Sequence, residues 1–300
     1  MSFFETLADR IAAVDSVVSV GLDPDPARLP EAVENRDLPR WAFNRRIIDA
    51  THEHAACYKP NAAFYEDAAG WRALRETIAY AHGKNVPVLL DAKRADIGNT
   101  ARQYATAASG EIDGVDADSE NGLTTRETGA EQGLGADAIT VTPYMGQDSL
   151  QPFFSSGAGV FILCRTSNPG GADLQGLELA SGEPVYRRVA ALADLWNEHG
   201  NVGLVVGATA PEELEELRTD VPGIPFLVPG IGAQGGDAEA AVEHGLAAYP
   251  GVDPDVGLVN SSRGIIFAGK NAADGRDGDN YFRAAGEAAK RLKRRLNQFR

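Results

Sequence analysis

The sequence has little cysteine and little lysine, with two cysteines and six lysines among 300 residues. Two thiols are too few for a disulfide framework or a four-cysteine zinc site. Cys57 and Cys164 both lie in apolar runs, so we expect buried free thiols and a reducing cytoplasmic environment. No apolar run approaches the roughly 20 residues of a membrane span. Residues 1–14 carry acids and lack the basic and apolar regions of a signal peptide.

Basic residues are outnumbered by acidic ones, 28 against 43, so the formal net charge is -15. Such a surface repels phosphates, which argues against nucleic acid or an anionic membrane as a partner. Of the 28 basic residues, 22 are arginines. Excess acid with few lysines is typical of surfaces adapted to high salt, where counter-ions screen the self-repulsion. An ordinary acidic cytoplasmic enzyme is the alternative.

Short apolar runs alternate with helical stretches along the whole chain. The expected strands are 16–22, 55–60, 87–92, 138–143, 159–165, 202–208, 226–231 and 257–262. The expected helices are 40–54, 69–84, 100–109, 148–156, 183–199, 211–220, 236–245 and 280–298. Strands without polar alternation are typical of parallel sheets that are buried on both faces. Eight such repeats predict a single (β/α)8 TIM barrel over residues 1–300 rather than a doubly wound sheet.

Two Gly-rich acidic stretches, at about 109–135 and 268–280, do not fit a minimal barrel. We expect both to be solvated surface loops. The first contains four acids that could suggest a calcium site, but they lack the full calcium-loop signature. These acids are Asp113, Asp116, Asp118 and Glu120.

Residues 91–96, DAKRAD, place charges of both signs directly after an apolar run. In a regular strand, side chains at i and i+2 share a face, so Asp91 and Lys93 are expected to project together. Asp96 then falls in the following turn, and Thr100 is expected to cap the next helix. Charges at the end of an apolar strand are costly unless they are paired. A structural salt bridge and a catalytic charge group are the two interpretations.

Polar residues follow several further strands, namely Asp23, Lys59, Ser167 and Arg263. In (β/α)8 barrels the active site lies at the carboxyl ends of the strands, so this recurrence predicts a ligand pocket. The glycine-rich residues 228–236, VPGIGAQGG, can offer backbone N–H groups to an anion, and the Arg263 guanidinium can bind phosphate in bidentate fashion. Phosphate sites after the seventh and eighth strands recur in this fold.

Several segments together resemble the orotidine 5′-phosphate decarboxylase family, in particular its branch with a DAKRxDIGxT core. They are VGLDP (20–24), YKPNAAFYE (58–66), LLDAKRADIGNTARQYA (89–105), GADAITVTPYMGQDSL (135–150), RTSNPGG (165–171), VVGAT (205–209), LVPGIGAQGG (227–236) and SRG (262–264). They lie in family order across nearly the whole chain. Ala95 stands where that branch often has glycine, and the 109–135 stretch is longer than usual, which leaves local structure and assembly open.

The resemblance implies decarboxylation of orotidine 5′-monophosphate to UMP and CO₂, the last step of de novo pyrimidine nucleotide synthesis, without metal or organic cofactor. It implies that Lys93 protonates C6 and that Asp91 faces the substrate carboxylate, within a charge network completed by Lys59 and Asp96. It also implies a homodimer with shared active sites, because Asp96 and Thr100 would enter the neighbouring subunit's site. The remaining implied contacts are Asp23 with the ribose, Ser167 with the pyrimidine edge, and Gln234 with Arg263 at the phosphate.

Three rival functions belong to the same kind of barrel. Magnesium-dependent 3-keto-gulonate-phosphate decarboxylases and hexulose-phosphate synthases share a DxKxxD strand, but they hold the metal with an acid where this chain has Lys59. A non-catalytic sugar-phosphate-binding barrel would not need the complete Lys-Asp-Lys-Asp set. A Schiff-base aldolase needs a neutral amine, whereas a lysine flanked by carboxylates stays protonated.

Overall fold

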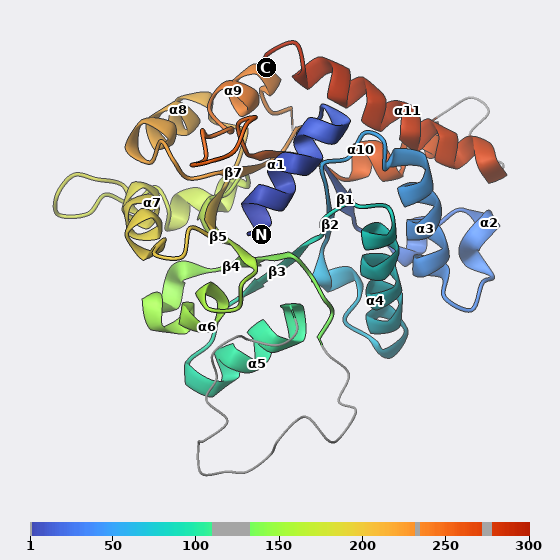
Figure 1. The fold of residues 1–300 in the computed structure, drawn as a ribbon, viewed down its shortest axis with the longest axis horizontal. Helices are drawn as coiled ribbons and strands as arrows, with labels where there is room; N and C mark the ends of the chain where they lie inside the picture. Colours follow the sequence, from blue (N-terminus) through green and yellow to red (C-terminus); the bar gives the residue numbers. More distant parts are fainter. Residues whose placement is uncertain (1, 110–132, 232–234, 272–277) are drawn as a thin grey trace.

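The computed structural model describes residues 2–109, 133–231, 235–271 and 278–300, and its centre is a ring of parallel strands (Figure 1). The strands are β1 (Val18–Leu22), β2 (Cys57–Pro60), β3 (Leu89–Arg94), β4 (Ala138–Val141), β5 (Gly159–Arg165), β6 (Val202–Val206), β7 (Phe226–Pro229) and β8 (Leu258–Ser261). They pair in the order β2-β1-β8-β7-β6-β5-β4-β3. Bridges from Tyr58 to Val88 and from Asn61 to Asp91 join β2 to β3 and close the ring. The predicted (β/α)8 barrel is confirmed.

Helices surround this ring, as Figure 1 shows. The α-helices of the described residues are α1 (Phe3–Val14), α2 (Glu31–Glu34), α3 (Pro39–Thr51), α4 (Ala68–Gly83), α5 (Gly98–Ser109), α6 (Gln151–Phe154), α7 (Val185–Trp196), α8 (Pro211–Asp220), α9 (Ala238–Glu243), α10 (Arg263–Ile266) and α11 (Gly278–Leu296). Each expected helix has a counterpart, although α6 is a single turn after a 3-10 turn at Gln147–Ser149. Within the described residues, no helix is both long and apolar enough to cross a membrane.

The strands are apolar because the barrel buries them from both sides. Every residue of β1, β2, β4, β6 and β8 is buried, so none of these strands shows a solvent-facing polar alternation. Cys57 and Cys164 are buried free thiols, as expected, and burial raises the pKa of both well above its usual range. Neutral buried thiols of this kind are unreactive.

Helix α1 was not among the expected elements. Ser2 and Glu5 form a reciprocal capping box at its start, which satisfies two backbone N–H groups that the helix leaves unpaired. The helix lies across the centre of the ring in Figure 1, and the rings of Phe3 and Phe4 pack edge-on against Phe161 of β5, with centroids 5.9 and 5.7 Å away. A side chain at Gly159 would place its Cβ 2.5 Å from the Phe3 ring. Glycine at the start of β5 therefore gives α1 room to cover the amino end of the barrel.

The carboxyl end of β3 departs from a regular strand. Leu90 pairs with Ile139 and Arg94 pairs with Val141, so three residues of β3 lie opposite Thr140 alone. Within this bulge Lys93 has φ +50°, a left-handed conformation that costs a non-glycine residue roughly 1–2 kcal/mol. Asp91 and Lys93 do project together, but the bulge brings them together rather than the regular pleat that we expected.

The helix after β3 begins earlier than expected. Gly98, with φ +53°, is the first residue of α5 and takes a conformation that residues with a side chain rarely adopt. This tight turn starts the helix two residues before Thr100. Thr100 therefore lies in the first turn of α5, and its expected role as N-cap is wrong.

Candidate active site

A cavity of about 210 Å³ opens at the carboxyl ends of β1, β2, β3, β7 and β8. Four of the expected site residues line it, namely Asp23, Lys59, Asp91 and Arg263. Asp23 and Arg263 come shortly after β1 and β8, whereas Lys59 and Asp91 lie within β2 and β3, and parallel strands of a barrel bring their carboxyl ends to one rim. The closed ring thus brings Asp23 and Arg263, which are 240 positions apart in the sequence, to one cavity.

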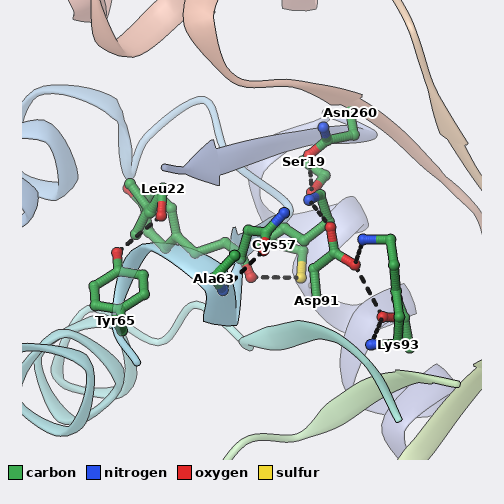
Figure 2. Close-up of polar contacts among 12 residues, drawn as sticks. Ser19, Leu22, Cys57, Ala63, Tyr65, Asp91, Lys93 and Asn260 are labelled. Carbon is green, nitrogen blue, oxygen red and sulfur yellow. Dashed lines mark hydrogen bonds and ion pairs between the residues drawn. The ribbon is translucent and has the colours of Figure 1, made fainter. Parts of the chain in front are cut away.

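Asp91 lies between two lysines at this rim. The Lys59 Nζ donates to Asp91 Oδ2 at 2.8 Å, and the Lys93 Nζ donates to Asp91 Oδ1 at 2.5 Å. Figure 2 shows Asp91 and Lys93 side by side, with their side chains directed toward one another. Lys59 and Asp91 are buried, whereas the Lys93 side chain is 47% exposed. Lys93 is therefore the solvent-exposed member of a group whose other two members, Lys59 and Asp91, are buried.

Electrostatics keeps the buried pair charged. Burial opposes ionisation of Asp91, but Lys59 and Lys93 outweigh it and hold the pKa of this carboxyl well below its usual range. Burial also opposes the charge of Lys59, yet the nearby carboxylates of Asp91 and Asp23 raise its pKa. The site therefore presents a fixed carboxylate between ammonium groups near neutral pH.

Asp23 offers a further acceptor beside Lys59. Its Oδ1 is buried and makes no hydrogen bond within the described part of the chain. An unsatisfied buried acceptor costs about 1–3 kcal/mol, so a donor from a ligand would stabilise it. Asp23 also lines the cavity, which puts its carboxylate beside the space for a ligand.

Another part of the cavity lining is suited to an anion. It consists of Gly230 and Ile231 after β7, and of Ser262, Arg263 and Gly264 after β8. Arg263 is exposed and makes no ion pair with any described residue. A Cβ on Gly21 would meet the Ser262 hydroxyl at 1.8 Å, so glycine in β1 lets this turn approach the barrel. Gln234, the other expected phosphate contact, lies outside the described residues, as do all four acids of the conceivable calcium site.

Four expected residues of the described chain do not line this cavity, namely Lys93, which pairs with Asp91 beside it, and Asp96, Thr100 and Ser167. Asp96 is half-buried, and its carboxylate accepts a hydrogen bond from the Ile97 N–H at 2.8 Å instead of approaching Lys93. Thr100 is exposed on α5. Ser167 follows β5, where a Cβ on Gly207 would come within 2.9 Å of it, so the glycine leaves space for the serine backbone. A single chain therefore assembles only part of the expected charge network.

Sequence reasoning missed several polar groups of the site, among them Thr140 and Asn260. The Thr140 hydroxyl of β4 donates a hydrogen bond to Asp91 Oδ1 at 2.9 Å. In the sequence, the one indication of such a role is that Thr140 is a polar residue within an apolar strand. Asn260 of β8 lines the cavity, and its Oδ1 accepts from the Ser19 hydroxyl at 3.1 Å, as Figure 2 shows. This contact leaves the Asn260 amide nitrogen to donate to a ligand. In the described ranges, no group of three or more His, Cys, Asp or Glu gathers as it would around a metal.

A sequence model described as the orotidine 5′-phosphate decarboxylase / HUMPS family matches residues 16–277. The chain belongs to this family. The orotidine 5′-phosphate decarboxylase of Halorubrum lacusprofundi is 72% identical to it over 100% of both chains. That of Haloarcula marismortui is 70% identical, also over 100% of both. The resemblance expected from the sequence is thereby confirmed.

Solved structures of the family have the same architecture. The structure of Leishmania donovani OMP decarboxylase is 41% identical and covers 100% of this chain and 98% of its own, with a TM-score of 0.75. A Toxoplasma gondii structure described as a putative orotidine-monophosphate decarboxylase is 34% identical over 99% of both chains, also with a TM-score of 0.75. The barrel and its cavity therefore belong to an orotidine 5′-phosphate decarboxylase scaffold along the full length of the chain.

Proposed function

We propose that this chain decarboxylates orotidine 5′-monophosphate to UMP and CO₂, the last step of de novo pyrimidine nucleotide synthesis. The observation that carries the proposal is the buried Lys59–Asp91 pair, extended by the ion pair of Asp91 with Lys93, in a chain 72% identical to a named orotidine 5′-phosphate decarboxylase. The activity is that of a carboxy-lyase. The protein's own charges supply the chemistry in this proposal, and no cofactor is invoked.

The cavity suggests how the substrate lies. Arg263, together with Gln234, holds the phosphate, because a guanidinium forms paired hydrogen bonds to phosphate oxygens. Asp23 accepts from the ribose hydroxyls, and Ser167 contacts the pyrimidine edge. This orientation places the pyrimidine C6 and its carboxylate beside Asp91 and Lys93.

The reaction then follows from the charges. Asp91 faces the substrate carboxylate, and two like charges 4 Å apart at an effective dielectric near 20 repel by about 4 kcal/mol. Breakage of the bond from C6 to the carboxylate carbon releases CO₂ and relieves this repulsion, while the electron pair stays on C6. The Lys93 ammonium stabilises that carbanion and then transfers a proton to C6 to give UMP. Lys59 keeps Asp91 ionised throughout.

Lys59 also argues against the magnesium-dependent rivals. Its ammonium lies 2.8 Å from Asp91 Oδ2, at the place where those enzymes hold a metal-binding acid. A second cation at that carboxylate would be repelled. The complete Lys-Asp-Lys group likewise distinguishes the chain from a barrel that only binds sugar phosphates.

A homodimer with shared active sites is part of the proposal. Asp96 and Thr100 do not line their own chain's cavity, and large apolar side chains are exposed on and around α5, where Trp71 and Tyr104 line one pocket. The exposed side chains are Trp71, Ile97, Tyr104, Tyr144 and Met145, with exposed fractions between 39% and 80%. Grouped apolar side chains of this kind mark interaction surfaces. A second copy seated there would bring Asp96 and Thr100 to its partner's cavity.

The setting and organisation are proposed from composition and relatives. A net charge of -15 and halophilic relatives favour a cytoplasmic enzyme with a salt-adapted surface. The acidic stretches at 109–135 and 268–280 are proposed to be surface insertions of a single barrel domain that spans residues 1–300.

The test is turnover by the purified protein. Orotidine 5′-monophosphate is supplied in buffer with EDTA, and the loss of its pyrimidine absorbance is followed together with UMP formation. We expect full activity in EDTA, and none on 3-keto-gulonate 6-phosphate or hexulose 6-phosphate with magnesium. Turnover of either sugar phosphate without turnover of the nucleotide would overturn the proposal.

A further inference from the structure

Thr140 of β4 lies opposite the β3 bulge that carries Asp91 and Lys93. Between the pairs Leu90–Ile139 and Arg94–Val141, it is the one β4 residue that faces three residues of β3. Its side chain is buried, with 1% exposed, and it does not line the cavity. Thr140 can therefore affect a bound ligand only through its neighbours.

The hydroxyl of Thr140 joins the two charged residues. The Lys93 backbone N–H donates to Thr140 Oγ1 at 3.0 Å, and Thr140 Oγ1 lies 2.9 Å from Asp91 Oδ1. A backbone N–H can only donate and an ionised carboxylate can only accept, so the single hydroxyl hydrogen is directed at Asp91. The side chain thus takes the place of the ladder hydrogen bond that the bulge removes.

We propose that Thr140 is a positioning residue for the decarboxylation. Its hydroxyl holds Lys93 in the left-handed backbone conformation, with φ +50°, and fixes the Asp91 oxygen that receives the Lys93 ammonium. Strained backbone of this kind persists only where neighbouring groups determine it. The inference rests on the proposed function and deepens it, because it names what aligns the proton donor with the carboxylate.

Two substitutions separate the hydroxyl from the shape of the side chain. Thr140→Val keeps the branched shape and removes the hydroxyl, whereas Thr140→Ser keeps the hydroxyl and removes a methyl group. We expect Thr140→Val to lower kcat by roughly 10- to 100-fold, the scale of a small misalignment of reacting groups. KM should stay near the wild-type value, because Asp23 and Arg263 are untouched. Thr140→Ser should retain most of kcat.

The control is Thr51→Val, which also removes a buried threonine hydroxyl with two hydrogen-bond partners, Ile47 O and Tyr58 OH. We expect this variant to lose stability without losing kcat well below its melting temperature. An equal loss of kcat in Thr51→Val and Thr140→Val would overturn the proposal, since the effect would then be one of general stability. A Thr140→Ser variant as impaired as Thr140→Val would overturn it as well.

Amide hydrogen exchange at Lys93 tests the positioning without any substrate. The Lys93 N–H loses its acceptor in Thr140→Val and should exchange faster, whereas Thr140→Ser should keep it protected. Unchanged Lys93 exchange in Thr140→Val would overturn the positioning role even if the wild-type protein is active. A wild-type protein that fails to convert orotidine 5′-monophosphate would instead overturn the proposed function, and the exchange result would still decide the role of the hydroxyl.

Discussion

The Nζ of Lys59 lies 2.8 Å from Oδ2 of Asp91, and both side chains are buried at the mouth of the barrel. The other oxygen of the same carboxylate accepts from Lys93 and from Thr140. Asp91 therefore uses both oxygens within the protein and stays ionised although it is nearly buried. A carboxylate fixed in this way can repel a substrate carboxylate without reorganising during the reaction.

Lys93→Ala should lower kcat by roughly 10⁴-fold or more, because the proton donor and the positive charge beside the carbanion disappear together. The fold should survive, since the Lys93 side chain is 47% exposed. Steady-state kinetics with orotidine 5′-monophosphate and a thermal melt check both expectations. Lys84→Ala, which removes a lysine paired with Asp49 away from the cavity, is the control. Activity of Lys93→Ala within tenfold of wild type would contradict the assigned role.

Arg263→Ala should raise KM roughly 10- to 100-fold, the expected loss of one or two charge-assisted hydrogen bonds to phosphate. Added guanidinium should restore part of the activity, because it can occupy the vacated position. Arg187→Ala provides the control, since Arg187 pairs with Asp220 on the outer helices. An unchanged KM would mean that the phosphate binds elsewhere.

Two individually inactive variants should complement each other if Asp96 acts across a subunit boundary. When Lys93→Ala and Asp96→Ala subunits exchange, each heterodimer has one site with both defects and one site with neither. Random mixing makes half of the dimers heterodimers with half of their sites intact, so roughly a quarter of wild-type activity should return. Absence of recovery after verified exchange would place Asp96 in its own chain's site.

His82 should stabilise the fold at acidic pH and lose this contribution as the pH rises. A hydrogen bond from its Nε2 to Asp137 Oδ2, at 2.8 Å, raises the pKa of His82 in the folded protein despite partial burial. The stabilisation is therefore complete below the unfolded-state pKa of about 6.5 and is lost as pH rises through the higher folded value. Chemical denaturation at a series of pH values should show that the free energy of unfolding declines less with rising pH in His82→Gln than in the wild-type protein. Substitution of the exposed His199 should leave the profile unchanged, and an unaltered profile in His82→Gln would refute the linkage.

Added salt should raise the free energy of unfolding and leave kcat almost unchanged. The net charge of -15 creates repulsion across the surface, which is screened as the Debye length falls from about 10 Å at 0.1 M to about 3 Å at 1 M salt. The free energy of unfolding should therefore rise with KCl. The buried Lys59–Asp91 pair is screened much less, so kcat of the folded protein should change little. A stability that falls with KCl would argue against surface adaptation to salt.

The sequence predicted the barrel well, because burial on both faces makes parallel strands visible as apolar runs. It also placed Asp23, Lys59, Asp91 and Arg263 at strand ends, and the closed ring brings these four to one cavity. Helix α1 was not predicted, although Ser2 and Glu5 carry the capping pattern of a helix start.

Other features depend on spatial neighbours that local patterns do not reveal. The bulge in β3 exists only relative to β4, so no pattern within 91–96 distinguishes it from a regular strand. The contact between Thr140 and Asp91 joins residues 49 positions apart and depends on that pairing. Asp96 could be recognised in the sequence, but its position outside the cavity of its own chain could not.

Helix α1 has a consequence for the route of substrate and products. Phe3 and Phe4 pack against Phe161 at the amino end of the barrel, whereas the cavity opens at the opposite end. The nucleotide, CO₂ and UMP therefore share one passage, and UMP must leave before the next nucleotide can enter. UMP should consequently inhibit by simple competition with the substrate.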